Sequence, residues 1–164
     1  MGALDDGERI RAADAAVWRA WLAENHERTG GVWPVRVFDD GTDDHASGQW
    51  FSPRRPGSGW AATNKARIAE LEAAGLLAPA GIRVLEAAKA NGSWTLLDGP
   101  EAGIEPDEFT AALDAVPVAR ANWDAFPKSI KKFGLTQIAM AKRPETKTAR
   151  IAKIVADAAE GKRP

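Results

Sequence analysis

Residues 50–67, WFSPRRPGSGWAATNKAR, combine cationic and aromatic side chains in an order that suits the binding of an anion. Adjacent arginines such as Arg54 and Arg55 offer paired hydrogen bonds to phosphate or carboxylate. A helix is expected to begin soon after them, and the free N–H groups at a helix start also attract anions. The ring of Trp60 offers a stacking surface for a base or another ring. The predicted ligand-binding residues here are Arg54, Arg55, Ser58, Trp60, Asn64 and Lys65.

A second basic cluster occupies residues 142–150. Lys142 and Arg143 directly precede Pro144, and proline suits the first position of a helix. Cations that stand just before a helix start resemble an anion cradle. The predicted ligand-binding residues of this cluster are Lys142, Arg143, Thr146 and Arg150.

Both clusters also have a structural interpretation, which the sequence leaves open. Phe51 and Trp60 could belong to the core, and the arginine pair could bind the acidic loop Asp39–Asp44. The residues around Lys142 could form a solvated hinge between two helices.

Catalysis and metal binding have little support. The chain contains no Cys, which excludes thiolate catalysis, thiolate metal sites and disulfides. His26 and His45 are too few for a histidine metal centre, and His26 suits the end of a helix. Common phosphate-loop, hydrolase and metalloprotease motifs are absent. We therefore expect a binding protein without cofactor or metal; the alternative is a small enzyme acting on an anionic substrate, with Glu70 or Glu145 as base.

The net charge of −1 conceals a strong segregation of charge along the chain. Residues 1–48 carry −5, residues 49–70 carry +3, residues 71–127 carry −6 and residues 128–164 carry +7. The basic blocks could pair with the acidic ones or converge on one face that attracts an anionic small molecule or an acidic protein surface. Nucleic acid is a less favoured partner because the overall pI is about 6.1.

The sequence pattern of the N-terminal part predicts one helix and a small sheet. Residues 9–25 have apolar side chains at helical spacing, and the glycines at 30 and 31 end this helix. Residues 32–38 predict a strand, in which Pro34 favours an edge position or a strand start. A second extended segment near residues 49–52 would complete an antiparallel pair.

In the rest of the chain, prolines, glycines and apolar spacing predict a series of helices. One begins near Ser58 or Thr63, which could cap it, and ends at Gly75. Others begin at or just after prolines 79, 106, 117, 127 and 144, with a short strand or arm at 93–97 and a linker at 98–106. The fold class is α+β and mostly α: a small antiparallel β element near the N-terminus, then a helical bundle. We divide the chain into residues 1–97, which include residues 52–60, here called the Arg-Pro loop, and residues 98–164. The two regions together are expected to form one compact unit.

Several blocks together resemble the bacteriocin-protection, YdeI/OmpD-associated family. They are Trp18-x-x-Trp21-Leu22-x-x-Asn25-His26, Gly31-Val32-Trp33, Phe51-Ser52-Pro53-Arg54-Arg55-Pro56-Gly57-Ser58-Gly59-Trp60, Asn64-Lys65-Ala66-Arg67, Ala141-Lys142-Arg143-Pro144-Glu145-Thr146 and Arg150-Ile151-Ala152-Lys153. They cover nearly the whole chain in the family's order. Two departures stand out: only residues 39–49 lie where the family has a longer stretch, so the N-terminal region is shortened, and residues 133–138 replace a helix rich in Tyr and Trp.

The resemblance implies a bacterial, cytoplasmic role in stress or bacteriocin tolerance, with no assigned catalytic residue, and an OmpD-associated-like character for residues 98–164. Together with the basic clusters, it leads us to expect a non-enzymatic protein that binds an anionic partner through a basic face. No apolar run is long enough to cross a membrane.

Overall fold

The computed structural model describes residues 8–12, 14–28, 30–39, 44–48 and 50–164, and between residues 33 and 48 it describes the backbone alone. The acidic loop and the side chains of Trp33 and His45, about which the sequence makes predictions, therefore lie outside the described part. The chain divides into two compact units, Met1–Arg55 and Pro56–Pro164. Residues 56–97 thus group with the helical region, whereas the sequence places a boundary after residue 97.

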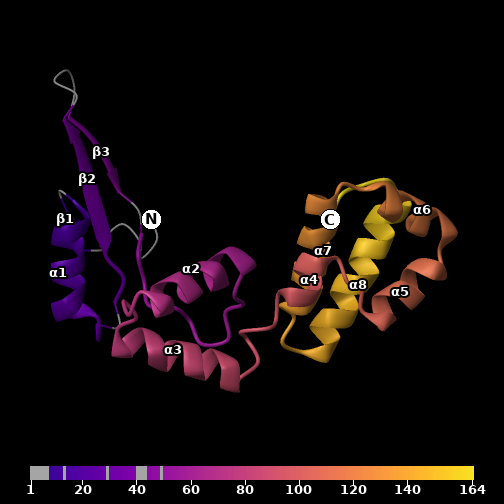
Figure 1. Ribbon diagram of the computed structural model, residues 1–164. Helices are drawn as coiled ribbons and strands as arrows, with labels where there is room; N and C mark the ends of the chain where they lie inside the picture. Colours follow the sequence, from indigo (N-terminus) through magenta and orange to yellow (C-terminus); the bar gives the residue numbers. More distant parts are fainter. Residues whose placement is uncertain (1–7, 13, 29, 40–43, 49) are drawn as a thin grey trace. The chain divides into compact units, whose positions relative to one another are not determined.

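The first unit contains a three-stranded sheet and one helix (Figure 1). Its elements are β1 (Arg9–Arg11), α1 (Ala15–Asn25), β2 (Trp33–Asp39) and β3 (Asp44–Gly48). Strand β2 lies between the others, antiparallel to β3 and parallel to β1. The prediction of an antiparallel pair near the N-terminus is confirmed, but its second strand is β3 and not the segment near residues 49–52. The parallel strand β1 was not predicted.

The helix predicted over residues 9–25 begins later, at Ala15. Asp14 explains this start, because its Oδ1 accepts the N–H groups of Ala16 and Val17 at 2.8 and 2.9 Å. Arg9–Arg11 are therefore outside the helix and pair with β2. The helix prediction was wrong for these residues because apolar spacing alone does not mark a cap.

Two details of the sheet bear on the sequence predictions. Pro34 lies at the start of the central strand, as one of the two predicted alternatives has it, and it precedes the antiparallel pairing, which begins at Val35. Its missing N–H therefore costs no bond to β3. The second strand lies at residues 44–48, and Phe51 forms only an isolated bridge with Val32.

The second unit is helical (Figure 1). Its elements are α2 (Ala62–Ala73), α3 (Pro79–Ala90), α4 (Asp98–Ala102), α5 (Asp107–Asp114), α6 (Pro117–Ala125), α7 (Lys128–Ala139) and α8 (Pro144–Ala159). Prolines open α3, α6 and α8 at their first positions, as predicted. Residues 93–97 form turns and not a strand, and the expected linker contains α4. The fold is mostly α with a small β element, which confirms the predicted class.

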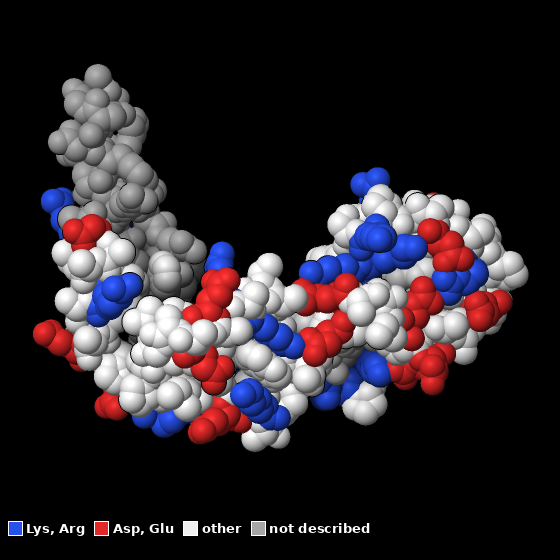
Figure 2. All heavy atoms as spheres, viewed as in Figure 1, with Lys and Arg blue, Asp and Glu red and all other residues white. Residues whose placement is uncertain are grey.

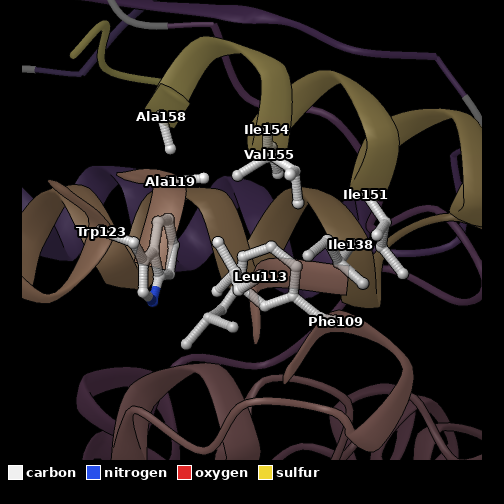
Figure 3. Close-up of a cluster of buried hydrophobic side chains, with 10 residues drawn as sticks. Phe109, Leu113, Ala119, Trp123, Ile138, Ile151, Ile154, Val155 and Ala158 are labelled. Atoms are coloured by element: carbon white, nitrogen blue, oxygen red, sulfur yellow. The ribbon is translucent and has the colours of Figure 1, made fainter. Parts of the chain in front are cut away.

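The main core lies among α5, α6, α7 and α8 (Figure 3). Phe109 and Trp123 are both 0% exposed and meet edge to face, with ring centroids 4.9 Å apart. The other buried members are Leu113, Ala119, Leu135, Ile138, Ile151, Ile154, Val155 and Ala158. This spacing of apolar residues on each helix is what the sequence predicts for a bundle.

A smaller core lies beside α2 and α3. Trp60, Leu85 and Ala88 are buried there, and Trp94 packs on Trp60 with ring centroids 5.3 Å apart. Because this cluster joins the end of the Arg-Pro loop to α3, it determines where the loop lies.

Candidate functional site

The backbone geometry of the Arg-Pro loop, residues 52–60, favours glycine at two positions. Gly57 has a φ of 78°, which favours glycine. A Cβ at Gly59 would lie 2.7 Å from Cγ of Leu97, so the backbone approaches Leu97 too closely for any side chain. These features bring the loop against the start of α4 and direct Trp60 into the smaller core.

Two predicted ligand-binding residues of this region have structural contacts. Trp60 is only 8% exposed and packs against Trp94. Lys65 forms an ion pair with Asp98 of α4, and its ammonium lies 5.2 Å from the centre of the Trp94 ring. The prediction that Trp60 and Lys65 bind a ligand gains no support from this placement.

Lys142 lies near Gly57 of the Arg-Pro loop, within the second unit. A Cβ at Gly57 would be 3.8 Å from Lys142 Nζ, and the side chain of Lys142 is exposed. Arg143, also exposed, is the residue before α8. Arg150 is different, because it donates to the backbone oxygen of Gln137 and thereby joins α8 to the end of α7.

The remaining predicted residues are Arg54, Arg55, Ser58, Asn64 and Thr146. Ser58, Asn64 and Thr146 are half-buried in the second unit, whereas Arg54 and Arg55 are exposed at the end of the first unit. The grouping of all ten residues on one face therefore stays a prediction.

A pocket of about 430 Å³ lies elsewhere in the second unit, between α4 and the first turns of α7. Its size is within the range of small-molecule sites. It is lined by Pro100, Glu101, Ala102, Gly103, Glu105, Lys128, Ser129, Lys131, Lys132 and Leu135. We call it the lysine pocket, after the three lysines that it gathers from one helix.

The positive charges of this pocket are only partly neutralised. Lys132 pairs with Glu101 at 2.8 Å, and Lys131 donates to the backbone oxygen of Asp124 at 3.1 Å. Lys128 has no ion pair within the described part of the chain. Blue side chains gather around α7 in Figure 2, with red ones beside them. The pocket therefore offers at least one ammonium group to an incoming anion.

Glu101 is held as a carboxylate on the wall of the pocket. The hydrogen bond from Lys132 and then that from the Ala62 N–H hold its pKa below the ordinary value of 4.5. The bond to Ala62 also replaces the cap that the sequence places at Ser58 or Thr63, since Ala61, the residue before α2, provides none. A local pattern could not show this, because Glu101 comes 39 residues later.

Glu105 belongs to a second network behind the pocket. It accepts Arg120 through both oxygens, at 2.7 and 3.1 Å, and Trp123 Nε1 at 2.8 Å. Burial raises the pKa of Glu105, but the hydrogen bonds from Arg120 and Trp123 outweigh it, so the pKa is below 4.5. Arg120 also binds Asp124 and lowers the pKa of that carboxyl. These groups stay ionised and bonded to one another, which suits a scaffold better than a general acid.

The structure adds little to the other chemical candidates. His26 ends α1 and its Nδ1 lies 2.9 Å from the Ala23 oxygen, as expected for a helix end. Glu70 and Glu145 are exposed and do not line the lysine pocket. Among the described residues, no group of three or more His, Asp or Glu could hold a metal ion. No helix in that part has both the length and the apolar composition to cross a membrane.

Two family models match parts of the chain. Residues 103–161 match the model of the family described as Bacteriocin-protection, YdeI or OmpD-Associated. This C-terminal region is therefore similar to that family. Residues 35–84 match a different model, described as Domain of unknown function (DUF8412). Searches of curated proteins and of solved structures gave no match.

The family match confirms the resemblance for residues 103–161. The Lys142–Arg150 cluster and the lysines of α7 lie inside the match, whereas the Arg-Pro loop lies inside the second match. Sequence reasoning missed the lysine pocket. Its one local signal is the pattern of Lys128, Lys131 and Lys132 on one face of a helix.

Proposed function

We propose that this protein is a non-enzymatic binding protein for a small anionic molecule, acting in bacteriocin or stress tolerance, and that the lysine pocket is its binding site. The observation that carries the proposal is a 430 Å³ pocket with three lysines and Ser129 on its wall. Lysine ammonium groups and a hydroxyl are suitable donors for phosphate or carboxylate. The acidic groups in the lining already have partners, so the available charge is positive.

Binding without catalysis agrees with the chemistry of the pocket. A general acid or base near neutral pH needs a carboxyl whose pKa is raised, and both carboxyl groups of the lining have lowered pKa values. The cytoplasmic location and the contribution of the Arg-Pro loop with Lys142 stay predictions.

The test is thermal unfolding with inorganic phosphate, glycerol phosphate and acetate at constant ionic strength. A ligand that binds only the folded protein raises the midpoint as its concentration rises. Lys128→Gln should weaken binding about five- to tenfold, because a charge-assisted hydrogen bond in a partly exposed site contributes about 1–1.5 kcal/mol.

The matched control is Lys153→Gln, which removes the same charge from an exposed part of α8 outside the pocket. It should leave binding unchanged. The proposal is wrong if none of the three anions raises the midpoint, or if Lys128→Gln and Lys153→Gln bind equally well.

A further inference from the structure

Glu101 connects the lysine pocket to the first turn of α2. Its Oε1 accepts Lys132 Nζ at 2.8 Å, and its Oε2 accepts the N–H of Ala62 at 2.8 Å. Glu101 and Lys132 both line the pocket, and Ala62 is the first residue of α2. One carboxylate thus holds a lysine of the binding site with one oxygen and a helix start with the other.

Helix α2 depends on this contact because it has no cap of its own. The first N–H groups of a helix need acceptors from outside the helix, and a negative charge there is also favoured by the helix dipole. Ala61 offers no side-chain acceptor. Glu101, which comes from α4, supplies both the acceptor and the charge.

An anion in the pocket would meet the same lysine that holds Glu101. A phosphate monoester carries close to two negative charges at neutral pH and three acceptor oxygens, so it competes for Lys132 better than a single carboxylate does. Its charge also repels the carboxylate of Glu101. Both effects weaken the two hydrogen bonds that Glu101 accepts, from Lys132 and from the Ala62 N–H.

We infer that the pocket selects a small phosphate-bearing ligand, and that its binding draws Lys132 away from Glu101 and loosens the first turn of α2. This inference rests on the proposed function, since it requires the lysine pocket to bind an anion. The effect stays local, because the ion pair of Lys65 with Asp98 still holds α2 at the end of this first turn. By thermodynamic reciprocity, removal of the Glu101 charge must strengthen phosphate binding.

The experiment is amide hydrogen exchange of the full chain with and without inorganic phosphate, together with titration of Glu101→Gln. Exchange should accelerate about twofold or more in the peptide over residues 61–66 and stay unchanged in the rest of α2. Glu101→Gln should bind phosphate about threefold more tightly, the size expected for loss of a partly exposed charge competitor. Acetate at the same ionic strength should produce a smaller change in exchange.

The control variant is Glu160→Gln, which removes a carboxylate paired with Lys162 outside the pocket. It should alter neither exchange nor affinity. If phosphate binds but exchange over residues 61–66 and the affinity of Glu101→Gln are unchanged, the coupling is refuted and the binding site stands. If phosphate binds neither protein, the proposed function fails as well.

Discussion

Gly134 shows how closely single residues are packed in the main core. A Cβ there would lie 3.0 Å from Cη2 of Trp123, which is 0% exposed, and 3.3 Å from Cγ of Pro164. Gly81 in α3 provides the contrast, because a Cβ there would meet nothing within 4 Å. Both glycines lie inside helices, where alanine is intrinsically preferred. Packing therefore requires glycine at the first position only.

We expect Gly134→Ala to lower the free energy of unfolding by about 1–2 kcal/mol, because the buried indole must move to admit a methyl group. Gly81→Ala should raise it by about 0.5–1 kcal/mol, the intrinsic advantage of alanine in a helix. Denaturant unfolding followed by tryptophan fluorescence measures both changes. Effects of the same sign at the two positions would contradict the packing observed around Trp123.

Between elements, the network of Glu105, Arg120 and Asp124 attaches the loop before α5 to α6. Arg120 donates to both carboxylates, and Trp123 donates to Glu105 from within the core. In the folded protein the pKa values of Glu105 and Asp124 lie below their ordinary values of 4.5 and 3.8. Unfolding restores those ordinary values, so protonation favours the unfolded chain.

This linkage predicts the acid sensitivity of the helical bundle. The stabilisation is fully present above the ordinary pKa values of 4.5 and 3.8, and it is lost as the pH falls through the lower values of the folded state. Glu105→Gln should reduce the stability at pH 7 by about 1–2 kcal/mol, since it leaves Arg120 with a weaker partner. In this variant the free energy of unfolding should also fall less steeply between about pH 5 and pH 3, as measured by urea unfolding at a series of pH values. An unchanged slope would exclude Glu105 as its source.

On the scale of the whole molecule, the second unit contains every part that the proposed function needs. Pro56–Pro164 include both hydrophobic clusters, the lysine pocket and the contact from Glu101 to Ala62. The match to the bacteriocin-protection family also lies within it, whereas the second family match crosses the boundary at residue 56. The second unit, to which we assign the proposed binding, is therefore larger than the family match.

We expect a fragment of residues 56–164 to fold alone and to bind phosphate within about twofold of the full chain, because a domain with its own core is independently stable. Circular dichroism tests whether the fragment folds, and calorimetric titration tests whether it binds phosphate. A fragment that stays helical but loses phosphate binding would show that residues 1–55 contribute to the site.

The sequence by itself determined where most helices of the second unit begin and end. Prolines 79, 117 and 144 stand at first helical positions, and Gly75 and Gly161 follow α2 and α8 in the left-handed conformation. These signals can be read from the sequence because helical hydrogen bonds and caps connect residues only a few positions apart. The resemblance of the C-terminal region to a known family was also recognisable, from short blocks of residues.

Only the tertiary structure decided which charged residues share a site. Lys132 meets Glu101 from 31 positions away, and Glu101 caps α2 across 39 positions. Trp60 and Lys65 are two of the ten predicted ligand-binding residues, and the structure shows their contacts with Trp94 and Asp98, which the sequence did not reveal. Apolar burial and ion pairing do not depend on distance along the chain. The lysine pocket therefore arises from the packing of α4 against α7, and the local sequence shows only its three lysines on one helix face.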